Sequence, residues 1–118
     1  MNILVTGASG QLGLSVRDAA NCSDNNFVFS DIRAEGDVIP LDITDASAVS
    51  KVLKDNEISA VINCAAYTDV NRAESEPAIA DMVNCKAAGV LASAAAQADA
   101  LLVHISTDYV FAYIRYIN

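Results

Sequence analysis

Short apolar runs alternate along the chain with longer segments in which apolar residues recur every three or four positions. The short runs are rich in Val, Ile, Leu and Phe and carry few charges, which is typical of strands buried on both faces of a parallel sheet. Five such runs predict strands at residues 3–5, 27–31, 38–42, 60–63 and 101–105.

The segments between these strands have helical spacing. It predicts helices from Gln11 to about Cys22, from Thr44 or Asp45 onward, and from Pro77 onward, because Ser, Thr and Asp cap helix starts and Pro suits a first turn. The apolar stripes expected to face the sheet are Leu12, Val16 and Ala19 or Ala20; Val49, Val52 and Leu53; and Ile79, Val83, Val90, Leu91 and Ala94.

Strands that alternate with helices predict right-handed crossovers and an α/β fold. We expect a Rossmann-like, doubly wound parallel sheet in a three-layer α/β/α arrangement. Pro40 has no N–H to donate to a neighbouring strand, so the run at 38–42 belongs at a sheet edge.

Composition limits the classes of function. The 118 residues suit one domain, and 53% hydrophobic against 19% charged residues exclude intrinsic disorder. With 15 acidic and 7 basic side chains the net charge is −8. A nucleic-acid or anionic-membrane surface needs clustered Lys and Arg, so neither partner is expected.

The sequence also predicts a cytoplasmic setting. No apolar run approaches the ~18 residues that span a bilayer, and the first residues lack the basic segment of a signal peptide. Cys22, Cys64 and Cys85 form no CxxC pair, which favours reduced thiols over a disulfide or a metal site. We interpret Cys64 as a small apolar filler, and His104 as a core or strand-end histidine bonded to backbone rather than a catalytic base.

A glycine-rich turn carries the first chemical signal. Gly7, Gly10 and Gly13 lie between the first predicted strand and helix. Gly7 would allow the tight turn, Gly10 would let a pyrophosphate approach the backbone, and Gly13 would let the helix pack close to the sheet. Such a turn can also occur with no ligand at all, and the motif alone leaves that open.

Two charged residues favour a dinucleotide. Asp31 ends the second predicted strand, 18 residues after Gly13, near the ~20 expected for an acid that binds an adenosine ribose. Arg33 could face a 2′-phosphate, so both NADH and NADPH remain candidates.

Four longer stretches carry a family resemblance. They read MNILVTGASGQLG at 1–13, LDITD at 41–45, VINCAAYTDV at 61–70 with AESEP at 73–77, and VHISTDYVF at 103–111. Through them the chain resembles the extended short-chain dehydrogenase/reductase family and, within it, the dTDP-4-dehydrorhamnose reductases.

The resemblance implies a role for each matching position. Gly10, Gln11 and Leu12 would line the pyrophosphate, and Asp31 the ribose. The remaining implied positions are Asp42 and Ile43 at the adenine, Ala65, Ala66 and Tyr67 under the nicotinamide, and Thr107 and Asp108 at the substrate, with Thr107 as the catalytic hydroxyl.

The implied reaction is reduction of the C4 ketone of a dTDP-linked deoxysugar by NADPH or NADH, giving dTDP-rhamnose. Two other interpretations stay open. One is a nucleotide-sugar epimerase or dehydratase of the same superfamily, and the other is a non-catalytic dinucleotide-binding module.

The C-terminal residues depart from the family. No Tyr-x-x-x-Lys follows Thr107, and residues 112–118 match nothing in it. We therefore expect an incomplete NAD(P)-binding domain, cut after about the fifth strand, whether as a fragment, a frameshift product or a natural truncation. The aromatic tail at 109–118 could cover the open edge of the fifth strand, or pair between two copies of the chain.

The missing Tyr-x-x-x-Lys element generates a prediction about activity. The 118-residue chain alone should not oxidise NADPH in the presence of the dTDP-4-keto sugar, because the proton donor is absent. Following the absorbance of the reduced cofactor checks this, and measurable turnover would contradict it.

Overall fold

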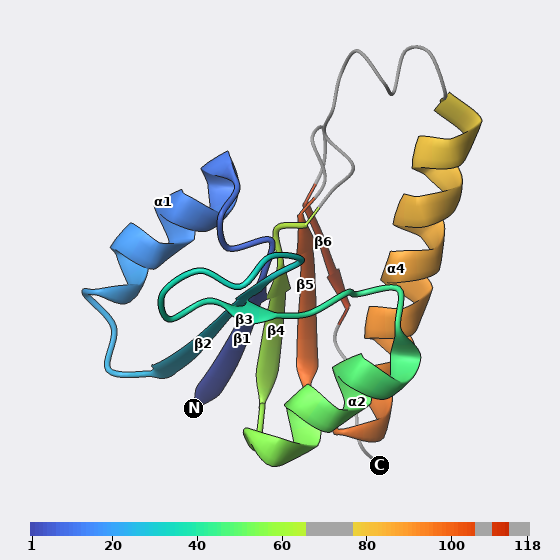
Figure 1. Cartoon of the computed structure of the whole chain (residues 1–118). Helices are drawn as coiled ribbons and strands as arrows, with labels where there is room; N and C mark the ends of the chain where they lie inside the picture. Colours follow the sequence, from blue (N-terminus) through green and yellow to red (C-terminus); the bar gives the residue numbers. More distant parts are fainter. Residues whose placement is uncertain (66–76, 106–109, 114–118) are drawn as a thin grey trace.

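A computed structural model describes residues 1–65, 77–105 and 110–113 (Figure 1). Strands and helices alternate along most of the chain. In order, the elements are β1 (Asn2–Thr6), α1 (Gln11–Ala20), β2 (Asn26–Asp31), β3 (Ile39–Pro40), α2 (Ala46–Asp55), β4 (Ala60–Asn63), α4 (Pro77–Gln97), β5 (Leu101–Ile105) and β6 (Val110–Tyr113).

The strands form one sheet in the order β3-β2-β1-β4-β5-β6. The first five run parallel, which confirms the predicted α/β class, and β3 lies at the edge that Pro40 predicts. From β1 the sheet continues to β2 and β3 on one side and to β4 and β5 on the other. The direction of the strand order therefore changes between β1 and β4, which is the place where doubly wound sheets bind ligands.

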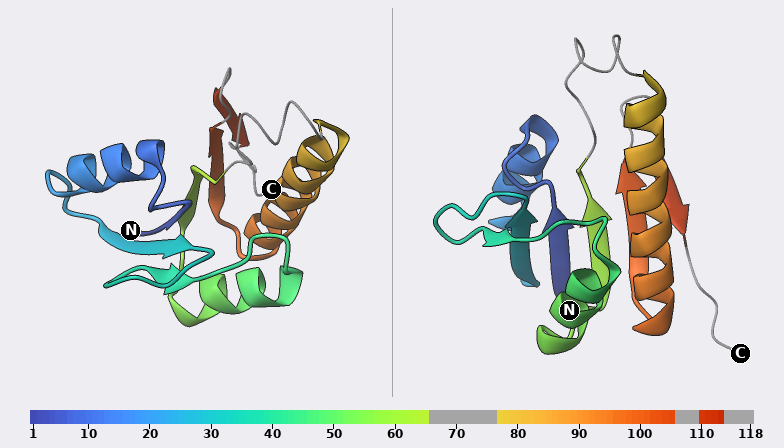
Figure 2. Two further views of the ribbon diagram at one scale, coloured as in Figure 1. Left: turned by 45° about the horizontal axis from the view of Figure 1, so that its top comes forward. Right: turned by 45° about the vertical axis from the view of Figure 1, so that its right-hand side comes forward.

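Helices cover both faces of the sheet (Figure 2). On one face, α2 and α4 pack over a core that includes Leu4, Val61 and Leu91, all with fully buried side chains. On the other, α1 covers a smaller cluster around Val5, which the half-buried Phe27 joins. No helix in the described residues is both long and apolar enough to cross a membrane.

The predicted stripe of α1 is partly wrong. Val16 and Ala20 turn inward, but Leu12 is 40% exposed and Ala19 is also exposed. Gly13 is the buried residue of this helix, because the helix packs on the turn before it through a position without a side chain. That contact rotates the helix and turns Leu12 outward.

The third predicted strand is shorter than its apolar run. The strand at 38–42 is reduced to Ile39–Pro40, because Glu35 and Val38 pair with each other and Asp42 bonds to Thr44 in a turn. The first helix begins at Gln11 and ends at Ala20, close to the predicted end at about residue 22.

The strand β6 covers the edge of β5. It pairs antiparallel with β5 within the same chain, with Val103 opposite Ala112. Of the two arrangements that the aromatic tail allowed, the structure has the one within a single chain. Association of two copies stays a prediction.

The helices α2 and α4 end in the same way. Glu57 and Asp99 have positive φ of 50° and 54°. In each case the next N–H reaches back to the carbonyl five residues earlier, from Ile58 to Leu53 at 2.9 Å and from Ala100 to Ala95 at 2.8 Å. This is the Schellman pattern, whose left-handed position favours glycine.

A glycine at the end of α2 should therefore stabilise the protein. We expect Glu57→Gly to raise the free energy of unfolding by up to about 1 kcal/mol, because a side chain in the left-handed region is strained. Urea unfolding followed by circular dichroism measures it. Glu57→Ala is the matched control, since it removes the charge but keeps the strain; a gain as large in this control would contradict the explanation.

Candidate functional site

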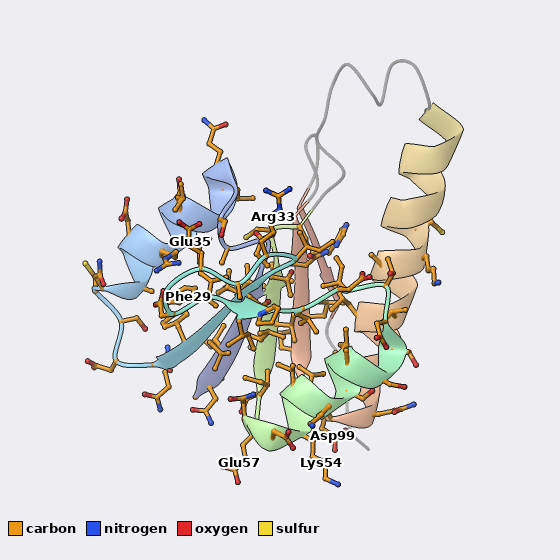
Figure 3. The ribbon with its side chains drawn as sticks, viewed as in Figure 1. Phe29, Arg33, Glu35, Lys54, Glu57 and Asp99 are labelled. Atoms are coloured by element: carbon orange, nitrogen blue, oxygen red, sulfur yellow. The ribbon has the colours of Figure 1, made fainter. Side chains whose placement is uncertain are left out.

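The carboxyl ends of the parallel strands meet at one edge of the sheet, where most of the predicted site residues lie. Figure 3 shows Arg33 at this edge, with Lys54, Glu57 and Asp99 at the opposite edge. The start of α1 also lies at the carboxyl edge, as Figure 1 shows.

The turn after β1 packs directly on the end of β4. Gly7 has φ +66°, and a Cβ there would lie 2.6 Å from Ala65 Cα and 2.7 Å from the carbonyl carbon of Cys64. Only glycine fits both the left-handed backbone and this separation. The Cys64 N–H donates to the Thr6 carbonyl at 3.0 Å, so the two strand ends are joined by backbone contact.

The other two glycines of the motif differ in their surroundings. A Cβ at Gly13 would lie 2.6 Å from Ala8 Cα, so this glycine packs α1 on the turn itself, not on the sheet as predicted. Among the described residues, a Cβ at Gly10 would meet only the Gly7 carbonyl oxygen, at 3.4 Å. Gly10 has φ −77°, which any residue can adopt. The fold therefore does not require glycine at position 10.

The first turn of α1 lacks a side-chain cap. Gly10 precedes the helix and offers no side chain, and the first turn contains no acidic residue. In α2, by contrast, the Asp45 carboxylate accepts a hydrogen bond from the Ala48 N–H at 3.2 Å. Gln11 and Leu12 are both exposed. The start of α1 is thus suited to an external anion, which the N–H groups and the helix dipole would bind.

Asp31 lies beside the glycine turn at the end of β2. Its carboxylate accepts hydrogen bonds from the Ser9 N–H at 3.0 Å and the Ile32 N–H at 2.7 Å. The Ala8 N–H donates to the Ser30 carbonyl at 2.9 Å. Asp31 is half-buried and attaches the turn to β2, a role that its sequence position did not indicate.

Asp42 and Ile43 follow β3. The Asp42 carboxylate accepts hydrogen bonds from the hydroxyl and N–H of Thr44, at 2.7 and 2.9 Å. These two bonds, with a weaker attraction from Lys86, hold the pKa of Asp42 below its ordinary value. Ile43 is half-buried and packs against the core under α2 and α4. Asp42 is therefore ionised at neutral pH, and its turn directs the chain into α2.

A buried polar group joins three strand ends. Asn63 is 0% exposed and Thr6 is 1% exposed. The Thr6 hydroxyl and the Ala65 N–H donate to Asn63 Oδ1, and Asn63 Nδ2 lies 2.7 Å from His104 Nδ1. His104 thus bonds to a side chain rather than to backbone as predicted. The sequence pattern did not single out Thr6 or Asn63, although each is a polar residue that ends an apolar strand.

Cys64 packs with the core under α1, as the interpretation of an apolar filler requires. Burial raises the pKa of its thiol, which is therefore protonated at neutral pH. Within the described ranges, no three His, Cys, Asp or Glu side chains are grouped so that they could hold a metal ion.

Of the remaining predicted residues, one lies within the described residues and four lie outside them. Ala65 is described and half-buried, in contact with the glycine turn. The positions that lie outside the described residues are Ala66, Tyr67, Thr107 and Asp108. The structure thus brings the predicted pyrophosphate, ribose and adenine positions to one edge, together with the first nicotinamide position.

Comparisons with known proteins agree with this geometry. The family model described as the RmlD substrate binding domain matches residues 1–113. A dTDP-4-dehydrorhamnose reductase of Mycolicibacterium smegmatis is 43% identical over 109 residues. The match covers 92% of this chain but 31% of that relative, so the chain spans about a third of the length of its relatives.

Two solved structures are similar in both sequence and fold. A dTDP-4-dehydrorhamnose reductase of Clostridium acetobutylicum has a TM-score of 0.78 at 38% identity, covering 94% of this chain and 38% of that one. A dTDP-4-dehydrorhamnose reductase of Bacillus anthracis in complex with NADP has a TM-score of 0.77 at 37% identity, covering 93% and 37%.

Proposed function

Because the chain belongs to the RmlD substrate binding domain family, we propose that it forms the NAD(P)-binding part of a dTDP-4-dehydrorhamnose reductase. Its relatives of that name are about three times as long, and one of them is a complex with NADP. The observation that carries the proposal is the start of α1, which follows the glycine turn and has no side-chain cap. It lies where the strand order of the sheet changes direction, between β1 and β4.

The residues of this edge fit a dinucleotide. The N–H groups at Gln11 and Leu12 would bind the pyrophosphate, since no side chain caps them. Gly10, whose own N–H donates to the Gly7 carbonyl at 3.1 Å, would line it. Asp31 has carboxylate oxygens beside the turn for a ribose hydroxyl, and Arg33 is exposed at the same edge for a 2′-phosphate. The bound nicotinamide would supply a hydride for the C4 ketone of the sugar.

The positions that follow β3, β4 and β5 complete the proposal through the family. Ile43 would border the adenine with Asp42, while Ala65, Ala66 and Tyr67 would pass beneath the nicotinamide. Thr107 would hydrogen-bond the sugar oxygen at C4, where negative charge develops, with Asp108 beside the substrate. The dTDP-linked 4-keto-deoxysugar is the partner that this arrangement implies.

A methyl group at Gly10 should block the pyrophosphate without affecting the fold. We expect Gly10→Ala to weaken NADPH binding by about 10-fold or more, because the added Cβ occupies the side from which the phosphate approaches. Fluorescence titration of the 118-residue chain with NADPH measures the affinity.

Gly89→Ala is the matched control for that experiment. Gly89 is exposed in α4, and a Cβ there meets nothing within 4 Å in the part of the chain that the structure describes. This variant should bind NADPH as the parent does and gain about 0.5–1 kcal/mol of stability from helix propensity. A folded Gly10→Ala chain that binds NADPH normally would contradict the pyrophosphate site.

Removing the guanidinium of Arg33 should affect NADPH and NADH differently. We expect Arg33→Ala to weaken NADPH binding by about 10-fold and NADH binding by less than about 2-fold, because only NADPH carries the 2′-phosphate. Lys54→Ala, at the opposite edge, makes the same change in net charge and should alter neither. Equal losses for the two cofactors would argue against a 2′-phosphate contact.

A further inference from the structure

The polar group at the ends of β1, β4 and β5 has only one consistent arrangement of hydrogen-bond donors. A backbone N–H can only donate, so the atom of Asn63 that faces the Ala65 N–H, at 3.1 Å, must be the amide oxygen. The Thr6 hydroxyl donates to the same oxygen. The amide nitrogen therefore faces His104.

The protonation state of His104 follows from that orientation. Asn63 Nδ2 has hydrogens but no lone pair to offer, and it lies 2.7 Å from Nδ1 of the imidazole. Nδ1 must accept, so it carries no proton and the ring proton lies on Nε2. Only a neutral His104 with this tautomer completes the group.

We propose that His104 is a positioning residue of the cofactor site, acting through Asn63 on the two backbone segments that Asn63 joins. The inference rests on the proposed function. Thr6 leads into the glycine turn, and Ala65 begins the segment assigned to the nicotinamide. By accepting from Nδ2, the neutral ring keeps the Asn63 oxygen directed at both. His104 takes no part in proton transfer to the substrate.

Protonation of His104 would disrupt this arrangement. An imidazolium presents an N–H at Nδ1, so two donors would face each other. Rotating the Asn63 amide would satisfy the ring but would turn an NH₂ group toward the Ala65 N–H, which would then lack an acceptor. Below the pKa of His104, the Ala65 backbone loses the bond that holds it against the glycine turn.

The thiol of Cys64, which follows Asn63, is protonated and so offers His104 no charge. Burial lowers the pKa of His104 below its ordinary value of 6.5. With a folded pKa below the unfolded one, the contribution to stability is complete above about pH 6.5 and decreases as the pH falls toward the folded pKa.

The first test needs no cofactor, and it benefits from His104 being the sole histidine of the chain. In ¹⁵N NMR spectra at neutral pH, Nδ1 should resonate as an unprotonated nitrogen and Nε2 as a protonated one. The Ala65 amide signal should shift with the same midpoint as the ring. A proton on Nδ1, or an Ala65 amide that does not follow the titration, would overturn the proposal.

The second test measures affinity for NAD⁺ by calorimetry at pH 7.5 and at one pH unit below the His104 midpoint found by NMR, since NAD⁺ lacks the 2′-phosphate that titrates at mildly acidic pH. We expect the parent chain to bind about 5-fold more weakly at the lower pH, the effect of one hydrogen bond. His104→Gln can still accept from Asn63 and should bind equally at both pH values, within about 2-fold of the parent at pH 7.5. His104→Phe cannot accept and should be weakened about 5-fold at both.

Circular dichroism establishes that each variant is folded. If parent and His104→Gln show the same pH profile, or if His104→Phe binds as the parent does, the positioning role is wrong. If the parent binds no dinucleotide at either pH, the proposed function fails and the role at a cofactor site fails with it. The NMR measurement separately decides whether the hydrogen-bonded group exists.

Discussion

Backbone lies directly on backbone where the glycine turn meets the end of β4, and the candidate site depends on this contact. Gly7 in the left-handed region leaves no atom between the turn and Ala65. Asn63 then satisfies the polar groups that such close packing buries, accepting from Thr6 and from the Ala65 N–H. A buried amide of this kind is stabilising only when all its bonds are made, which is why the geometry is so restricted.

The same contact determines where α1 begins. Gly13 packs on the turn, so the helix starts at the carboxyl edge with its first N–H groups uncapped and Leu12 turned to solvent. The chain carries a net charge of −8, which disfavours anions at long range. Salt screens such repulsion beyond about 10 Å, whereas hydrogen bonds from the helix start act at contact distance. The N–H donors at the start of α1, rather than the net charge of the chain, therefore allow this edge of the sheet to bind a diphosphate.

Much of the fold could be predicted because burial on both faces leaves a clear signal. The bounds of β4 and β5 agree with their apolar runs, and Pro40 indicated the edge position of β3. Predictions were wrong where a backbone contact or a turn competed with periodicity, as for Leu12. The polar group around Asn63 was missed since its three side chains come from strands far apart in sequence.

The sequence by itself determined the α/β class, the glycine turn and the membership of the family, since these depend on periodicity and on residue types in fixed local order. Only the tertiary structure decided that Asp31 bonds to the turn, that Gly10 has space beside it while Gly7 has none, and which ring nitrogen of His104 faces Asn63. Each of these depends on the distance between atoms of separate strands, and hydrogen bonds and steric contacts change over a few tenths of an ångström. No spacing along the chain encodes such distances.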